Sequence, residues 1–292
     1  MGNRRTFLIH EIVKYSQKID QKGFAANHDG NISAKLDDVL LATPSAVSKG
    51  NIVADMIITL DSLGKKIEGI GKPFSEIKLH LEAYQMRPDA KAVVHAHPPF
   101  TTARGLVNLP LEPYLPEAIV SIGNFIPVDA NVSRALSLSD VLMIPGNGVL
   151  AIGDDVEQAY LRVELIEHLA KIEFYAKQMG TLTPLKPEEI QTLLEKRKSI
   201  GLGPQAKNIP FDSTIQTENK NSTVKTEMNF RDSALIDPSI LVSQRDGEER
   251  ATGVYKQYMT VASDDANKAE SQKTKGILEN LIAEEIKKVL KG

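Results

Sequence analysis

The stretch Ser75–Pro99, SEIKLHLEAYQMRPDAKAVVHAHPP, contains the pattern on which the fold prediction depends. Its first half places apolar residues such as Ile77 and Leu81 at spacings of three and four, which is typical of an amphipathic helix that Pro88 ends. Its second half, residues 92–97, is an apolar and β-branched run closed by two prolines, which cannot donate to a strand ladder. The stretch therefore predicts a helix followed directly by a strand.

Two histidines, His95 and His97, lie in the predicted strand. Side chains on a strand alternate between its two faces, so both imidazoles point the same way and lie a few ångström apart. Such a pair suits a Zn²⁺-type cation, because imidazole nitrogen is a common zinc ligand. The alternative is that both histidines only lie on the solvated face of a sheet. The position of the pair, after an apolar run and before a double proline, favours the metal site.

The composition is that of an ordinary globular protein. The chain has 292 residues, of which 41% are hydrophobic, and this predicts one large domain with a smaller additional part. The formal net charge of −3 gives no reason to expect a nucleic-acid partner. The basic cluster EKRK at residues 195–198 is interpreted as the solvated side of a helix end. No apolar run approaches the roughly 20 residues of a membrane span, so no membrane partner is expected.

The sequence contains no cysteine, which excludes disulfides and thiolate zinc sites. Any bound metal must therefore be held by imidazole and carboxylate groups. The first 17 residues form an amphipathic pattern without an unbroken apolar core, so no signal peptide is expected. Both features are compatible with the cytosol.

Hydrophobic periodicity and turn residues predict the other elements of the first 200 residues. Helices are predicted over residues 8–23, 101–109, 155–180 and 186–198, and strands after Gly30, at 52–60, around 125–126 and twice within 139–152. Asn147 and Gly148 give a tight-turn signal between the last two strands. His80 and His168 lie on predicted helices beside charged neighbours and are interpreted as surface or packing residues.

Three features together resemble the class II aldolase/adducin family: Glu76 at the start of the helix, RPDAKAVVHAH at residues 87–97, and PGNGVLAIG at residues 145–153. This family includes fuculose- and rhamnulose-1-phosphate aldolases and ribulose-5-phosphate 4-epimerases. The resemblance extends over about residues 5–182. It implies an α/β fold, in which a central and mostly antiparallel sheet lies between helices in a three-layer α/β/α arrangement. It also implies a catalytic domain over residues 1–202 and a homotetramer.

The resemblance implies that His95 and His97 bind a divalent metal, with Zn²⁺ as the favoured ion, and that Glu76 is the catalytic acid and base. Zinc aldolases of this family usually take a third histidine from an H-G pair, and this sequence has Asn147 at that place. Asparagine offers only a neutral oxygen, so Asn147 is expected to be at most a weak ligand. The remaining position could be filled by Glu76, by water or by His168, or the ion could be a harder one such as Mg²⁺ or Mn²⁺.

The resemblance also implies a site for a substrate phosphate. In the resembling aldolases a G-N-x-S loop helps to hold this group, which here indicates Gly30 and Asn31. Ser45 lies in the sequence TPSA, where the family tends to have TPTG, and Ser75 directly precedes the glutamate. The alanine of TPSA replaces a glycine that would permit the closest backbone approach.

The last 90 residues differ in composition from the rest. Residues 203–272 are polar and show no sustained hydrophobic period, which predicts a mostly disordered linker. Residues 273–292 have apolar residues at steps of three and four, which predicts an amphipathic helix. This arrangement resembles the encapsulation peptides that carry enzymes into bacterial microcompartments. It implies a shell protein as partner and the microcompartment lumen in the cytoplasm as location; the alternative is that the helix folds back onto its own domain.

The leading hypothesis from the resemblance is a metal-dependent aldolase. It would cleave a 1-phosphorylated deoxyketose, such as fuculose or rhamnulose 1-phosphate, to dihydroxyacetone phosphate and lactaldehyde. A 4-epimerase of the same family would use the same metal and the same bond cleavage but would recombine the fragments. A non-catalytic, adducin-like scaffold is favoured by Asn147 and by Val128, which lies near the place of a catalytic tyrosine in fuculose aldolases.

Overall fold

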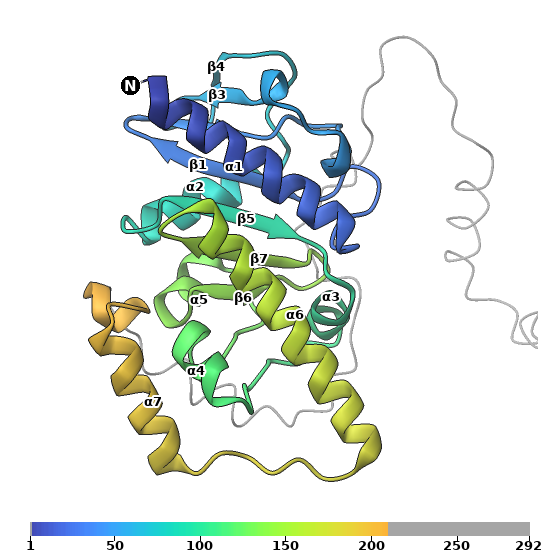
Figure 1. Ribbon diagram of the computed structural model, residues 1–292, viewed down its shortest axis with the longest axis vertical. Helices are drawn as coiled ribbons and strands as arrows, with labels where there is room; N and C mark the ends of the chain where they lie inside the picture. The colour runs from blue at the N-terminus through green and yellow to red at the C-terminus, as the bar shows by residue number, and fades with distance from the viewer. Residues whose placement is uncertain (1, 210–292) are drawn as a thin grey trace, which may run out of the picture. The chain divides into compact units, whose positions relative to one another are not determined.

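A sheet of seven strands forms the centre of the part of the chain that the computed structural model describes, residues 2–209 (Figure 1). The strands are β1 (Asn31–Leu36), β2 (Val39–Ala42), β3 (Ile58–Leu60), β4 (Lys66–Glu68), β5 (Ala92–Ala96), β6 (Val141–Met143) and β7 (Val149–Gly153). Their order is β4-β3-β2-β1-β5-β7-β6, and each neighbouring pair is antiparallel. The predicted antiparallel sheet is confirmed.

Helices cover both faces of this sheet (Figure 1). α1 (Gly2–Gln21) and α6 (Val156–Met179) pack on one face, and α2 (Ile77–Met86) and α5 (Val132–Leu138) pack on the other. The remaining helical segments are α3 (Pro99–Leu106), α4 (Pro116–Ile122), α7 (Pro187–Ser199) and the 3₁₀ turns η1 (Lys49–Asn51), η2 (Ala54–Met56) and η3 (Pro204–Lys207). The three-layer α/β/α arrangement is therefore confirmed. No helix among the described residues is long and apolar enough to cross a membrane.

Successive residues of β5 enter the two halves of the core. Val93 packs with the α2 and α5 face, whereas Val94 packs with the α1 and α6 face, and both side chains are fully buried. Because both faces of the strand are covered, it needs apolar residues at every position rather than in alternation. This explains the continuous apolar run in the sequence before the first histidine.

The prediction of one strand over residues 52–60 is wrong for its first two thirds. Only β3 pairs with the sheet, and the chain before it forms η1 and η2. The turns send Ile52 and Ile57 into the core on the α1 side, whereas Ile58 and Leu60 enter the core on the α2 side. An apolar run that serves both halves of the core therefore does not need to be one strand.

The strand predicted around residues 125–126 is also wrong. Residues 116–122 form α4, and Ile126 makes only an isolated antiparallel bridge with Leu111. Two backbone hydrogen bonds, of 2.9 and 3.2 Å, join these two residues, and no longer ladder follows. The residues that follow make a second isolated bridge, a parallel one between Val128 and Met143 of β6, so local β propensity here produces two single bridges and no strand.

The interpretation of residues 195–198 as solvated is wrong for Arg197. This side chain is buried, its Nη2 lies 2.6 Å from Asp140 Oδ2, and its Nη1 donates to the Val120 backbone oxygen at 2.8 Å. Arg87 and Arg162 also form ion pairs with Asp140. Removing one member of a buried ion pair costs about 3–5 kcal/mol, so this cluster fastens α7 to the edge of the sheet.

The chain that follows the predicted domain boundary at residue 202 continues into η3, which contacts α5 and α7. The remainder of the predicted linker and the predicted helix at 273–292 lie outside the described residues.

The long helix predicted from residue 155 is confirmed as α6, which Asp155 caps by accepting a hydrogen bond from the Gln158 backbone nitrogen at 2.7 Å.

Candidate metal centre

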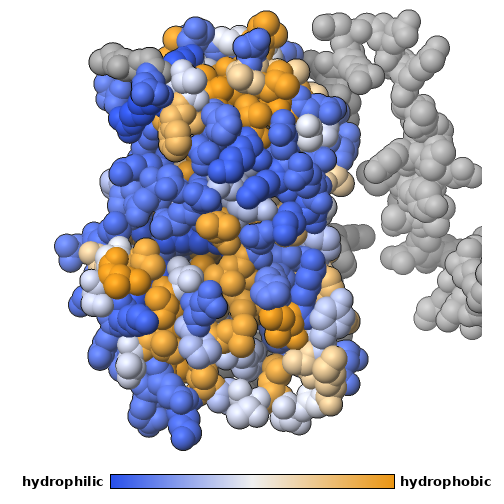
Figure 2. Space-filling view, viewed as in Figure 1, coloured by the Kyte–Doolittle hydropathy of each residue, from blue (hydrophilic) through white to orange (hydrophobic). Residues whose placement is uncertain are grey.

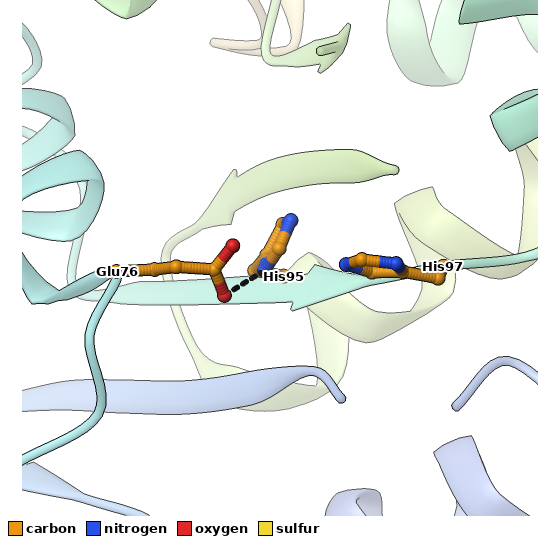
Figure 3. Close-up of side chains that lie close together, drawn as sticks. All are labelled: Glu76, His95 and His97. Atoms are coloured by element: carbon orange, nitrogen blue, oxygen red, sulfur yellow. Dashed lines mark ion pairs between the residues drawn. The ribbon is translucent and has the colours of Figure 1, made fainter. Parts of the chain in front are cut away.

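Glu76, His95 and His97 come together at the end of β5, on the face of the sheet that α2 covers (Figure 3). Glu76 immediately precedes the first residue of α2, His95 is the fourth residue of β5, and His97 follows the strand. Glu76 Oε2 lies 3.0 Å from His95 Nδ1, and the two imidazole rings have centroids 5.0 Å apart. The helix start and strand end therefore place one carboxylate and two imidazoles in a row.

These three side chains suit a divalent cation. Each can offer one ligand atom such that all three atoms lie within 4.8 Å of one another, and this is the one such group of three or more found in residues 2–209. His95 Nδ1 is buried and has no well-directed hydrogen bond within the described chain, although it faces Glu76. Two imidazole nitrogens and one carboxylate oxygen are the donors of many Zn²⁺ sites and suit other first-row metals too.

The charges of the three groups depend on one another. Burial would raise the pKa of Glu76, but the charge and close contact of His95 and hydrogen bonds from Asn147 and Asn31 outweigh it and hold this pKa below its ordinary value. Burial likewise lowers the pKa of His95, and Glu76 reverses this, so that it is raised overall. Burial and the neighbouring His95 lower the pKa of His97. The carboxylate is therefore ionised at neutral pH, and His97 favours the neutral form that a metal requires.

Asn147 approaches His95 through its backbone rather than its side chain. The Asn147 backbone oxygen lies 2.7 Å from His95 Nε2, and its backbone nitrogen donates to the Ile144 oxygen at 2.9 Å within the turn between β6 and β7. Its side chain lies close enough to Glu76 to lower the pKa of that group. The role of Asn147 as a weak metal ligand stays a prediction. His168, the reserve ligand, is exposed on α6 and is not a member of the group.

Gly148→Ala is expected to disturb the centre, whereas Gly146→Ala is the matched control. Both glycines have a positive φ, +71° and +70°, so the two substitutions add similar backbone strain. At Gly148 an added Cβ would clash with the Ala96 backbone oxygen and lie 2.8 Å from His97 Cδ2, whereas at Gly146 the nearest atom would be 3.9 Å away. The overpacking should lower the free energy of unfolding of Gly148→Ala by about 1–3 kcal/mol more than that of Gly146→Ala.

Thermal unfolding and metal content of the two variants check this expectation. Gly148→Ala should also bind less metal, because His97 must move, and Gly146→Ala should keep the wild-type content. Equal stability and equal metal content in the two variants would contradict the proposed packing of the turn against His97.

The residues predicted to bind phosphate lie on three segments that contact one another. The first segment contains Gly30 and Asn31, the second contains Ser45, and the third contains Ser75. Gly30 has φ +75°, and a Cβ there would lie 3.0 Å from the His95 backbone oxygen, so both backbone conformation and space favour glycine. Asn31 pairs with His95 across the two strands, and its Nδ2 donates to Glu76 Oε2 at 2.8 Å. The Ser45 backbone nitrogen donates to the Lys72 oxygen at 2.9 Å, which joins the second segment to the third.

The hydroxyl groups of the two predicted serines differ in accessibility. Ser45 is half-buried and Ser75 is exposed, directly before Glu76. Ala46 has a left-handed backbone with φ 59°, a conformation that glycine adopts more readily than alanine. Phosphate binding by these residues stays a prediction.

A buried network that the sequence did not indicate lies beside the centre. Ser33 Oγ lies 2.7 Å from His80 Nδ1 and 2.9 Å from the Tyr84 hydroxyl, which itself donates to the Ser33 backbone oxygen at 3.0 Å. Burial lowers the pKa of His80 to about 3, so its ring is neutral. The network ties α2 to β1, which fixes Glu76 relative to Asn31. His80 is thus a packing histidine, as predicted.

The chain matches the family model of the class II aldolase and adducin N-terminal domain over residues 10–174, and it belongs to this family. An L-fuculose phosphate aldolase of Methanococcus vannielii is 31% identical over 172 residues, which are 56% of this chain and 94% of that protein. One from Escherichia coli O6:H1 is 30% identical over 210 residues, which are 68% and 97% of the two chains. A solved L-fuculose 1-phosphate aldolase has 27% identity and a TM-score of 0.59, covering 65% of this chain and 96% of its own. The predicted family is confirmed.

Proposed function

We propose that this chain is a divalent-metal-dependent aldolase that cleaves a 1-phosphorylated deoxyketose of the fuculose or rhamnulose 1-phosphate type. Its products would be dihydroxyacetone phosphate and lactaldehyde. The observation that carries the proposal is the group of Glu76, His95 and His97, in which an ionised carboxylate lies beside two imidazoles within 4.8 Å. Membership of the family and the fuculose phosphate aldolase relatives support the same reaction.

The residues of the centre have distinct roles in this reaction. Cleavage removes a proton from the hydroxyl group on one side of the breaking carbon–carbon bond and returns a proton to the carbon on the other side. His95 and His97 would hold the divalent ion, for which we favour Zn²⁺, and the bound ion would supply Lewis-acid stabilisation of negative charge on substrate oxygen. Glu76 accepts and returns the proton, because its carboxylate is ionised and its side chain is partly exposed, at 23%. Asn31 orients this carboxylate through its hydrogen bond.

The substrate phosphate would be held by Gly30, Asn31, Ser45 and Ser75. These residues offer backbone amides, a side-chain amide and hydroxyl groups, all of which donate to anionic oxygen. The hydrogen bonds between Ser45 and Lys72 and between Asn31 and Glu76 keep the three segments adjacent.

Metal analysis of the purified protein, combined with turnover of a panel of phosphorylated ketoses, tests the proposal. Bound metal together with release of a free aldehyde would support an aldolase. Interconversion of two phosphorylated pentuloses without free aldehyde would support the 4-epimerase instead. A protein that binds no metal and turns over none of the ketoses would support the adducin-like scaffold. Val128 favours that alternative, because it is a buried apolar residue and offers no proton at the place of the family's tyrosine.

We further propose that residues 273–292, which lie outside the described residues, dock the enzyme to a shell protein in the lumen of a bacterial microcompartment. The spacing of apolar residues from Ile277 to Leu290 supports this, since an isolated amphipathic helix of this length requires a partner surface. Burial of four or five large aliphatic side chains contributes about 1.5–3 kcal/mol each before the cost of ordering, which suits reversible docking.

Deleting residues 210–292 is expected to leave turnover and metal content unchanged, because the residues of the candidate centre lie within 30–148. Fusing residues 273–292 to an unrelated soluble protein should send that protein into co-expressed shells. Leu281→Glu combined with Ile282→Glu should prevent this by placing charges on the apolar face. An unfolded truncated enzyme, or a fusion that stays dispersed in the presence of shells, would show that the helix belongs to the fold.

We also propose a homotetramer, as the family resemblance implies. Several large apolar side chains are exposed on the second half of α6 and at the end of α3, including Phe174, Tyr175 and Leu106 at 50%, 53% and 55%. Figure 2 shows apolar groups on the surface over the lower part of the fold, where α6 lies. A contact between subunits would cover such groups. Light scattering of the purified protein measures the number of subunits and so tests the proposal.

A further inference from the structure

Lys49 is a buried lysine on η1, with only 2% of its surface exposed. Lysine is almost never fully buried unless its ammonium group has partners. Lys49 Nζ donates to the backbone oxygen of Val47 at 2.7 Å and to that of His28 at 3.2 Å. No carboxylate oxygen lies within 4.0 Å of it in the described residues, so it is held by two neutral carbonyl groups.

The two carbonyl groups belong to the two loops that carry the predicted phosphate-binding residues. His28 lies two residues before Gly30, and Val47 lies two residues after Ser45. The ammonium group therefore connects these loops from their buried side, while the Ser45 backbone nitrogen connects the second loop to the third. Burial lowers the pKa of Lys49 to about 8, against the charges of Asp29, Asp20 and Glu76, which raise it. The ammonium form therefore still predominates at neutral pH.

The residues predicted to contact the phosphate lack a cation of their own. Gly30, Asn31, Ser45 and Ser75 are all neutral donors, whereas a phosphate monoester carries nearly two negative charges at neutral pH. In a site of low dielectric constant a buried charge acts over several ångström, and lysine acts as a point charge. Such compensation requires a cation close to these loops, and the ammonium group of Lys49 lies between two of them.

We propose that Lys49 is a positioning residue that joins the two loops and supplies the positive charge behind a phosphate monoester bound by them. The inference rests on the proposed function, because it assumes a phosphorylated substrate. Lys49 does not touch the reacting atoms, so it should affect affinity for the phosphate group more than the chemical step.

Lys49→Gln is the decisive variant, because glutamine removes the charge but keeps a hydrogen-bond donor on a side chain one bond shorter. The probe is inorganic phosphate, and its dissociation constant is measured by calorimetry at constant ionic strength. We expect Lys49→Gln to weaken phosphate binding roughly tenfold or more, Lys49→Arg to restore most of the affinity, and Lys65→Gln to leave it unchanged. Lys65 is the control, because it is an exposed lysine directly before β4 and lies on none of the three segments of the predicted phosphate site.

Kinetic constants separate the proposed role from a merely structural one. For a phosphorylated ketose that the wild type cleaves, Lys49→Gln should raise KM by roughly tenfold and change kcat by less than about threefold. A fall in kcat at unchanged KM, or wild-type phosphate affinity in Lys49→Gln, would overturn the inference and leave the proposed function intact. A wild-type protein that neither binds phosphate nor cleaves a phosphorylated ketose would overturn the proposed function and the inference together.

A measurement on the wild-type chain covers the case in which Lys49→Gln does not fold. The ¹⁵N resonance of Lys49 Nζ should shift when inorganic phosphate is added and stay in place when sodium chloride of equal ionic strength is added. A resonance that phosphate does not move would overturn the inference.

Discussion

Glu76→Gln is expected to slow carbon–carbon bond cleavage and proton exchange on dihydroxyacetone phosphate by about 10²- to 10⁴-fold, the usual contribution of a general acid or base. Glutamine has the shape of glutamate, and its Oε1 can still accept the hydrogen bond that Asn31 donates to Glu76. Its amide cannot accept a proton, so the proton transfer should be lost while the fold is kept. The metal should remain bound at least in part, because the two imidazoles are unchanged.

Proton exchange measured by NMR in deuterated water, together with metal analysis, checks this prediction. Glu82→Gln is the matched control, because Glu82 lies on the same helix but accepts hydrogen bonds from Ser133 on α5, both at 2.9 Å. It should exchange at close to the wild-type rate. Exchange at the wild-type rate in Glu76→Gln would remove Glu76 from the mechanism.

The sequence was sufficient for the parts of the fold whose signal is local. The helix and strand of residues 75–99 each have a short-range pattern, and α2 and β5 lie where that pattern predicts. The alternation of a strand was enough to predict that His95 and His97 face the same way, and the structure brings them into one group with Glu76. These predictions needed no knowledge of which strands are neighbours.

The sequence was not sufficient where a residue depends on a distant partner. The carboxylate of Asp140 accounts for the burial of Arg197, and 57 positions separate the two residues, so the charge run at 195–198 carried no sign of it. Ser33 and His80 are 47 positions apart, and their contact depends on how α2 packs on β1. The role of Lys49 likewise depends on two carbonyl groups that only the packing of the loops brings together.

The position of His95 does not depend on the side chain at position 147. His95 is held from three sides: Asn31 is its cross-strand partner, Glu76 faces its Nδ1 and the Asn147 backbone oxygen contacts its Nε2. A backbone oxygen is present whatever side chain occupies position 147. The orientation of His95 therefore does not require the asparagine side chain.

His95→Ala and His97→Ala are each expected to reduce bound metal from close to one ion per chain to nearly none, with a corresponding loss of turnover. Each substitution removes one of two nitrogen ligands, and the carboxylate and single imidazole that remain are a poor site for a borderline metal such as Zn²⁺. Asn147→Ala should keep most of the metal, because its contact with His95 is made by the backbone. His168→Ala should bind as much metal as the wild type, because His168 is exposed on α6.

Inductively coupled plasma mass spectrometry of the four purified variants measures metal per chain, and circular dichroism confirms that each is folded. Wild-type occupancy in either His95→Ala or His97→Ala would contradict the proposed centre. Near-complete loss in Asn147→Ala would instead assign a ligand role to the asparagine side chain. In that case the metal would be held by two imidazoles and a neutral amide oxygen, which suits a harder ion than Zn²⁺ better.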